Sequence, residues 1–70
     1  MALGFLRGRN GSYPLETING DVYFRDSSNR TVATGFRPNG NRYAGPDGSS
    51  HDLASMLSAI QLRYDQGRYT

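Results

Sequence analysis

The residues that could perform catalysis gather around the only histidine of the chain. Within the run SSHD, Ser49, His51 and Asp52 supply the three side-chain types of a hydrolase triad. Neighbours in sequence on the first turn of a helix, however, point in different directions. Ser49 and Asp52 also have the spacing of a capping box, whose two side chains bond to free N–H groups at a helix start. We therefore expect these residues to cap a helix and to form no catalytic site.

The remaining residues with useful chemistry do not form a site either. The chain has no cysteine, which excludes disulfides and thiolate metal ligands, and one histidine does not suffice for a compact zinc site. Its glycines follow no phosphate-binding pattern, and residues 46–52 lack the alternating acids of a calcium loop. The acidic residues are scattered along the chain: Glu16, Asp21, Asp26, Asp47, Asp52 and Asp65. We expect no enzyme activity, no metal, no cofactor and no small-molecule substrate.

The run from Ser49 to Gly67 is the one long segment with a helical period. Gly67 stands where such a helix would end, because glycine readily adopts the left-handed conformation that closes a helix. Five apolar side chains recur on one stripe at about 100° per residue: Leu53, Met56, Leu57, Ile60 and Tyr64. We expect this stripe to face the core.

The opposite face of the predicted helix carries mostly small side chains. It consists of Ser55, Ser58, Ala59 and Leu62, and Arg63 borders it. Two interpretations stay open, a solvated face of low charge or a docking face, since small residues let another backbone approach closely. Our hypothesis for a partner-binding site is this set of five residues.

The stretch from Tyr13 to Arg25 has the strongest strand signal. Asn19-Gly20 separates two apolar-rich runs, and both residues of a type I′ turn need the positive φ that Asn and Gly tolerate. This turn predicts the cross-strand pairs Ile18–Asp21, Thr17–Val22, Glu16–Tyr23 and Leu15–Phe24. One face of the hairpin then carries the predicted core residues Leu15, Thr17, Val22 and Phe24.

A second turn, at residues 26–30, leads to a third strand. A three-residue loop with Asn29 left-handed places Val32, Thr34 and Phe36 on the core face, whereas a four-residue loop would turn them outward. We predict the shorter loop, because it buries Phe36 and leaves Gly35 outside. Pro38-Asn39-Gly40 then ends the strand, and residues 41–48 form a loop with a turn at Pro46-Asp47-Gly48.

These elements predict an α+β fold, a three-stranded antiparallel β-meander with one C-terminal α-helix packed on one face. The single small β-β-β-α domain spans residues 13–70. Residues 1–12 contain an apolar cluster, but glycines at positions 4, 8 and 11 argue against a stable element. We expect a flexible or partner-anchored arm there.

Length and composition favour a role in protein contacts. A chain of 70 residues buries only about 60% of its unfolded surface, so its core is thin. Small scaffolds without disulfides or metals commonly gain stability from a partner. The leading prediction is therefore a non-enzymatic protein-interaction module with a protein partner or a second copy of itself. It would be a self-assembling structural or virion component, or an inhibitor or adaptor docking on a larger protein.

The setting that we expect is the cytoplasm or a virion, without secretion. No run approaches the length of a membrane span, and the first residues lack the order of a signal peptide. The net charge of +2 makes the chain only mildly basic.

The alternative is a small nucleic-acid-binding protein. All eight basic residues are arginine, whose guanidinium suits phosphate, although the composition of a GC-rich genome explains the same bias. Some DNA-binding modules place the free face of a small sheet in the major groove. The candidate residues for this function are Arg7, Arg9, Tyr23, Arg25, Arg37 and Arg42.

Overall fold

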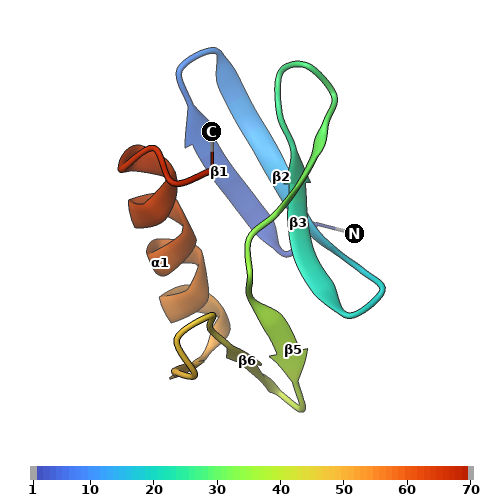
Figure 1. Ribbon diagram of the computed structural model, residues 1–70, viewed down its shortest axis with the longest axis vertical. Coiled ribbons are helices and arrows are strands. Elements are labelled where there is room, and N and C mark those ends of the chain that lie inside the picture. The colour runs from blue at the N-terminus through green and yellow to red at the C-terminus, as the bar shows by residue number, and fades with distance from the viewer. Residues whose placement is uncertain (1, 70) are drawn as a thin grey trace.

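The larger of two antiparallel sheets has four strands in the order β1-β2-β3-β4 (Figure 1). The computed structural model describes residues 2–69. The strands of this sheet are β1 Gly4–Gly8, β2 Gly11–Ile18, β3 Asp21–Arg25 and β4 Thr31–Ala33. A smaller sheet contains β5 Arg37–Asn39, β6 Arg42–Ala44 and β7 Ser50–His51, and helix α1 spans Leu53–Asp65. The α+β class is confirmed, and the predicted meander is present as β2-β3-β4, but β1 adds a fourth strand to it and β5, β6 and β7 form a second sheet that was not predicted.

The β2–β3 hairpin has the predicted turn. Asn19 and Gly20 have φ values of 51° and 80°, as a type I′ turn requires. Three of the predicted pairs form: Glu16–Tyr23, Thr17–Val22 and Ile18–Asp21. The ladder stops before the fourth predicted pair, Leu15–Phe24. The next hydrogen bond of the ladder would need a donor at residue 14, which is a proline and has no N–H.

The first strand corrects the prediction of an arm over residues 1–12. β1 pairs with β2 along its whole length, and Leu6 is fully buried. The glycines that argued against a strand serve close packing instead. A Cβ on Gly8 would lie 2.4 Å from the ring of Tyr13 and 3.0 Å from the hydroxyl of Tyr64. Gly8 therefore marks an approach of aromatic side chains to the backbone, not a flexible segment.

The third predicted strand is divided by a bulge at Gly35. Thr34 N donates to Val22 O and Val22 N donates to Phe36 O, each at 2.9 Å. Val22 of β3 therefore lies opposite three residues, 34–36, of the neighbouring segment. Gly35 has a φ of 86°, which only glycine adopts at low cost. Thr34 and Phe36 are buried as predicted, and Asn29 has the predicted left-handed φ of 62°. Beyond the bulge the chain leaves the larger sheet.

The smaller sheet contains a strand where a loop was expected. Residues 42–44 of the predicted loop form β6, which pairs with β5 on one side and β7 on the other. Gly40, with a φ of 64°, begins the two-residue turn between β5 and β6. The predicted turn at Pro46-Asp47-Gly48 forms and connects β6 to β7. Strands of two or three residues are too short to show an alternating pattern in the sequence.

Helix α1 begins three residues later than predicted. Asp52 is its N-cap, because the Asp52 Oδ1 accepts a 2.8 Å bond from Ser55 N, and Ser49 takes no part in the cap. At the other end Gly67 has a φ of 76° and its N–H donates to Tyr64 O. Arg68 N donates to Arg63 O, which completes a Schellman motif and confirms the predicted end of the helix.

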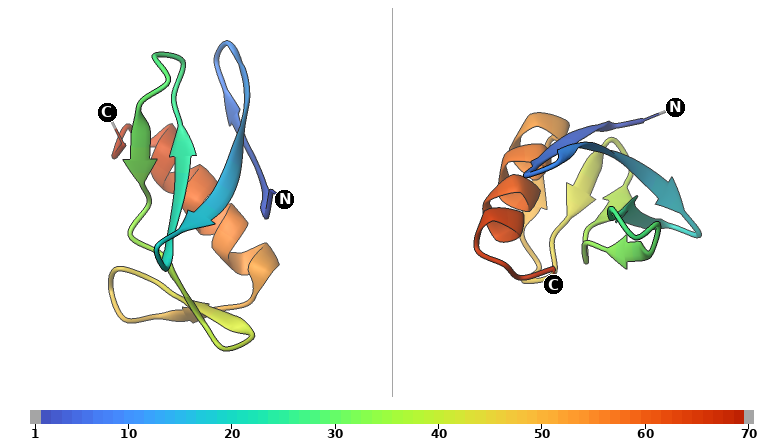
Figure 2. Two further views of the ribbon diagram at one scale, coloured as in Figure 1. Left: turned by 90° about the vertical axis from the view of Figure 1, so that its right-hand side faces the viewer. Right: turned by 90° about the horizontal axis from the view of Figure 1, so that it is seen from above.

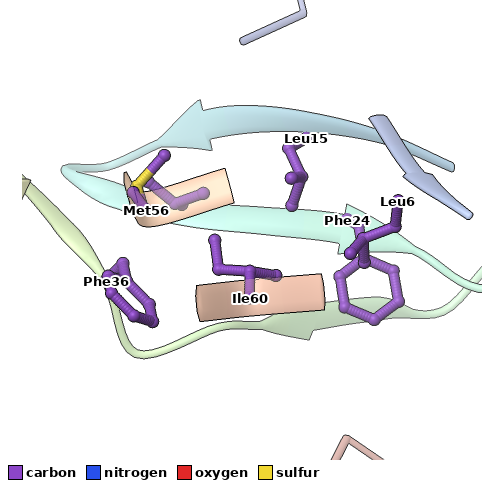
Figure 3. Close-up of a cluster of buried hydrophobic side chains, with 7 residues drawn as sticks. Leu6, Leu15, Phe24, Phe36, Met56 and Ile60 are labelled. Atoms are coloured by element: carbon purple, nitrogen blue, oxygen red, sulfur yellow. The ribbon is translucent and has the colours of Figure 1, made fainter. Parts of the chain in front are cut away.

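The helix lies across the inner face of the larger sheet, with the smaller sheet at one end (Figure 2). Seven hydrophobic side chains are buried between these layers: Leu6, Leu15, Val22, Phe24, Phe36, Met56 and Ile60. Figure 3 shows Ile60 between an end that contains Phe36 and Met56 and an end that contains Phe24 and Leu6. Two predicted core residues are wrong, because Leu53 is 41% exposed and Thr17 is exposed. No helix among residues 2–69 is long and apolar enough to cross a membrane.

Candidate functional site

The predicted partner-binding face of α1 is only partly free. Ser55, Ser58 and Leu62 are exposed, and Leu62 keeps 57% of its surface in solvent. Ala59, in contrast, packs against the core. The Arg63 guanidinium lies 5.1 Å from the centre of the Phe36 ring and donates to Ala59 O. The helix is rotated so that the Ala59 and Arg63 side turns inward, which leaves three of the five predicted residues for a partner.

A second apolar surface lies on the outer side of the larger sheet. We define the outer face by the exposed or half-buried side chains Phe5, Pro14, Glu16, Ile18, Tyr23 and Ala33. Phe5 pairs with Pro14 across β1 and β2, and Tyr23 pairs with Glu16 and with Ala33. Phe5 points away from the core because its neighbour Leu6 points into it. Phe5 is 63% exposed, more than any other large hydrophobic side chain of the described residues.

The free edge of β1 is covered by the helix. The Gln61 side chain accepts a 2.9 Å bond from Arg7 N and donates a 3.2 Å bond to Arg7 O. Its amide thus takes the place of a neighbouring strand at this residue. The Gln61 side chain therefore hinders strand addition at this residue of the β1 edge.

The six candidate nucleic-acid residues do not form one surface. Arg37 donates to Asp21 Oδ1 at 3.0 Å, and Arg42 donates to Ser50 Oγ at 2.7 Å in the smaller sheet. Tyr23 is half-buried on the outer face, and Arg25 follows it at the end of β3 with a long bond to a backbone carbonyl. Tyr23 and Arg25 thus share the outer side of β3, whereas Arg7 and Arg9 both line a groove at the end of the β1–β2 hairpin.

The histidine lies in a chain of hydrogen bonds, contrary to the expectation that its neighbours point apart. His51 Nε2 lies 2.6 Å from Ser49 Oγ, and His51 Nδ1 lies 2.7 Å from Ser55 Oγ. The Ser49 hydroxyl also donates to Asp47 Oδ1, and this bond lowers the pKa of the Asp47 carboxyl below its usual value. Ser49 and His51 meet because they precede the helix in extended backbone, where residues two apart share a side.

The direction of these bonds follows from counting hydrogens. The single hydroxyl hydrogen of Ser49 points to Asp47, so Ser49 Oγ accepts from His51 Nε2–H. In the neutral ring Nδ1 then accepts from the Ser55 hydroxyl. In this arrangement His51 donates to Ser49 and does not accept its proton. These bonds, with the 5.5 Å edge contact between the His51 and Phe36 rings, connect the smaller sheet to the first turn of α1.

The groove lies at the other end of the helix, about 15 Å from Ser55 at 1.5 Å per residue. Its volume is about 550 Å³, and its lining residues are Arg7, Gly8, Arg9, Tyr64, Asp65 and Tyr69. They come from the β1–β2 hairpin, the last turn of α1 and the segment after it. Asp65 accepts a 3.0 Å bond from the Gln61 side chain and forms no ion pair among residues 2–69.

Two of the lining residues, Tyr64 and Tyr69, pack with their rings on buried Phe24. Phe24 makes edge contacts with Tyr64 and Tyr69, with ring centroids 6.0 Å and 5.8 Å apart. Tyr13 lies 6.1 Å from Phe24 and 6.3 Å from Tyr64. The Tyr69 hydroxyl donates a 3.1 Å bond to Thr34 O, which fixes the segment after the helix to the sheet.

Burial raises the pKa of Tyr64 and of Tyr69 above the usual value of 10.0. For Tyr64 the next contribution comes from Tyr13, and the charge of Arg9 opposes the rise. For Tyr69, Arg63 and Arg68 oppose it. The folded state therefore holds these protons more tightly than the unfolded state does, so stability is fully present below pH 10 and falls as the pH rises through the raised pKa values.

We expect the melting temperature to fall between pH 10 and pH 12, as the phenolate forms are disfavoured in the fold. Thermal denaturation followed by circular dichroism across this range measures the fall, and tyrosinate absorbance identifies late-titrating groups. In Tyr69→Phe the fall should be shallower. A melting temperature that stays constant up to pH 12 would show that the two phenols are not buried in the fold.

Two of these features have no local signal in the sequence. Phe5 was assigned to an arm, because Phe5 and Leu6 are both apolar and show no alternation, so its exposure on a strand could not be foreseen. The groove joins residues near both ends of the chain, and no local spacing reveals such a junction. The described residues contain no group of three His, Asp or Glu side chains placed to hold a metal ion.

Comparison with known proteins finds no relative of the chain. Neither a family model, nor a curated protein, nor a solved structure matches it.

Proposed function

We propose that the protein is a small non-enzymatic interaction module that associates with a second copy of itself through the outer face. The observation that carries this proposal is Phe5, a large aromatic side chain that is 63% exposed although it lies within a regular strand, β1. Aromatic side chains are enriched at protein interfaces and dominate their binding energy. Burying the exposed part of this ring contributes about 1–2 kcal/mol to association.

The size of the core supports association. Seven fully buried hydrophobic side chains serve a chain of 70 residues that has no disulfide. Domains of this size have little stability to spare, and a partner subunit is one of the usual supplements. A second copy of the chain is present wherever the first is made, so it is an available source of the additional buried surface.

The charges of the outer face suit a copy of itself. Glu16 lies in the middle of the face and forms no ion pair among residues 2–69. Arg25, at the end of the neighbouring strand, has only a 3.4 Å bond to Asn29 O. In a two-fold symmetric dimer every contact between two different residues occurs twice. Glu16 of each copy therefore contacts Arg25 of the other copy, which gives two equivalent contacts. A surface that carries both signs is complementary to itself.

The outer face is a better candidate than the helix face. Leu62 stands alone there among serines, and a single exposed leucine is ordinary in a monomer. Ala59 and Arg63 are engaged with the core, which narrows the strip of small residues. The outer face instead joins Phe5, Pro14 and Tyr23 through cross-strand pairs.

Sedimentation velocity at about 100 µM tests the proposal. The wild-type protein should sediment as a dimer, and Phe5→Arg should sediment as a monomer with an unchanged circular dichroism spectrum. Ser58→Arg is the matched control, because it adds the same charge to the exposed helix face. It should leave the dimer intact.

A wild-type monomer at this concentration would overturn the proposal. A dimer that persists in Phe5→Arg and dissociates in Ser58→Arg would move the interface to the helix. Ala59→Arg is unsuitable for this comparison, because Ala59 packs against the core and its replacement would disturb the fold.

We place the protein in the cytoplasm or in a virion. The chain of 70 residues has no cysteine, in agreement with a reducing compartment that offers no disulfides. Association with a second copy agrees with a self-assembling structural component. An inhibitor or adaptor that docks on a larger protein would use the same face.

A further inference from the structure

Within residues 2–69, three of the eight arginines have a guanidinium without a partner, and all three lie at one end of the molecule. The guanidinium groups of Arg25, Arg30, Arg37, Arg42 and Arg63 each donate to an oxygen within the chain. Those of Arg7, Arg9 and Arg68 have no hydrogen bond or ion pair to any described residue. Arg7 and Arg9 line the groove, and Arg68 is the neighbour of its lining residue Tyr69.

The groove is held in shape by its surroundings. The backbone of Arg7 is fixed by two hydrogen bonds with the Gln61 side chain. Tyr69 is fixed by its bond to Thr34 O and by its edge contact with Phe24. A ligand that binds in the groove therefore meets aromatic rings that are already in position, which reduces the entropy lost on binding.

The charge of the groove is positive. Among residues 2–69, Asp65 is the one acidic residue that lines the groove, against the two arginines. The carbonyl groups at the end of α1 also attract cations in general, but Leu62 O, Arg63 O and Tyr64 O each accept a backbone N–H. Neither the carboxylate nor the helix end pairs with the guanidinium groups, which are therefore available to an anion.

We propose that this groove binds a nucleoside phosphate, with the phosphate at the guanidinium groups of Arg7 and Arg9 and the base at the tyrosine rings. Guanidinium groups bind phosphate oxygens in a bidentate manner, and every base can stack on an aromatic ring. The volume of about 550 Å³ lies within the usual range of small-ligand sites. The ligand is either a free nucleotide or one nucleotide of a single-stranded nucleic acid, since both present the same chemistry.

Arg7 lies two residues from Phe5 on β1 and therefore on the same side of that strand, whereas Arg9 lies in the turn that follows. Nucleotide binding in the groove is therefore separated from self-association by Arg9→Gln rather than by Arg7→Gln. Its test is a titration of the full chain, labelled with ¹⁵N, with deoxyadenosine 5′-monophosphate, deoxyadenosine, inorganic phosphate and an oligodeoxyadenylate of about eight nucleotides. The monophosphate should shift the amide signals of Arg7, Arg9, Tyr64 and Tyr69. It should bind more tightly than either the nucleoside or phosphate alone. A much tighter oligonucleotide would identify a strand as the source, and equal affinity would identify the free nucleotide.

Arg9→Gln and Arg7→Gln should each weaken binding at least about tenfold, the effect of losing a hydrogen bond to a charged group. Arg42→Gln is the matched control, because it removes the same charge from the smaller sheet at the opposite end of the fold (Figure 1). Its affinity should equal that of the wild type. Equal weakening by all three variants would reduce the effect to net charge and overturn the site. The absence of shifts at the groove with every probe at 5 mM would overturn it as well.

Discussion

Replacing Leu6 with alanine is expected to remove about half of the stability of the fold. Leu6 is fully buried in the core, between the sheet and the helix. Truncation of a buried leucine costs about 2–5 kcal/mol, through lost burial and the cavity that remains. A domain of 70 residues has a stability of about 4–10 kcal/mol in total. Urea denaturation followed by circular dichroism should therefore show a transition shifted to much lower urea concentration.

Phe5→Ala is the matched control for this experiment. It truncates the adjacent residue of the same strand, whose ring is mostly in solvent. At a protein concentration low enough for the wild type to be monomeric, we expect a change below about 1 kcal/mol, as for most surface substitutions. Equal and small effects at both positions would mean that the N-terminal segment does not pack on the core, and the arm predicted from the sequence would be restored.

Replacing Phe36 with alanine should be as damaging, because this ring connects the two sheets to the helix. Phe36 is fully buried, contacts the His51 ring and lies beneath the Arg63 guanidinium. The loss of a buried phenylalanine costs about 3–5 kcal/mol. We expect a largely unfolded protein at 37 °C, measured by the same denaturation experiment and by the dispersion of amide proton signals.

Leu53→Ala is the control for the loss of an apolar side chain, because it truncates a residue of the helix that lies outside the buried core. Leu53 belonged to the predicted core stripe of the helix but is 41% exposed. Its truncation should cost about 1 kcal/mol or less, since little buried surface is lost. If Leu53→Ala were as destabilising as Phe36→Ala, the helix would have to be rotated so that Leu53 enters the core.

The sequence predicted those elements whose chemistry is local. Asn19-Gly20 permits one turn geometry, and this geometry sets the register of the hairpin. Asn29 and Gly67 likewise occupy left-handed positions that few other residues tolerate, so the second turn and the helix end were also predicted. In each case two or three neighbouring residues contain all the information needed.

Elements that depend on tertiary packing were not predictable in this way. Gly8 was taken as a sign of flexibility, whereas its lack of a side chain admits the rings of Tyr13 and of Tyr64, which is far away in sequence. The start of the helix was misplaced because Ser49 and Asp52 are both good caps. In the structure the Ser49 hydroxyl is bonded to Asp47 and His51, which leaves Asp52 as the cap.

The candidate site residues likewise divide into those whose position follows from the local sequence and those whose position depends on tertiary packing. Ser55, Ser58 and Leu62 are exposed, as the helical period required, but the period could not show that Ala59 turns to the core. Arg7 and Arg9 were singled out as phosphate ligands on a loose arm. Their place beside Tyr64 and Tyr69 depends on the packing of both chain ends.

The most direct test of self-association through the outer face is an isotope-filtered NMR experiment on a mixture of labelled and unlabelled protein. It detects only contacts between two copies. We predict contacts from the Phe5 ring of one copy to the outer face of the other, around Pro14, Glu16 and Tyr23. Intermolecular contacts at Ser58 and Leu62 of the helix, or none at all at about 1 mM protein, would contradict self-association through this face.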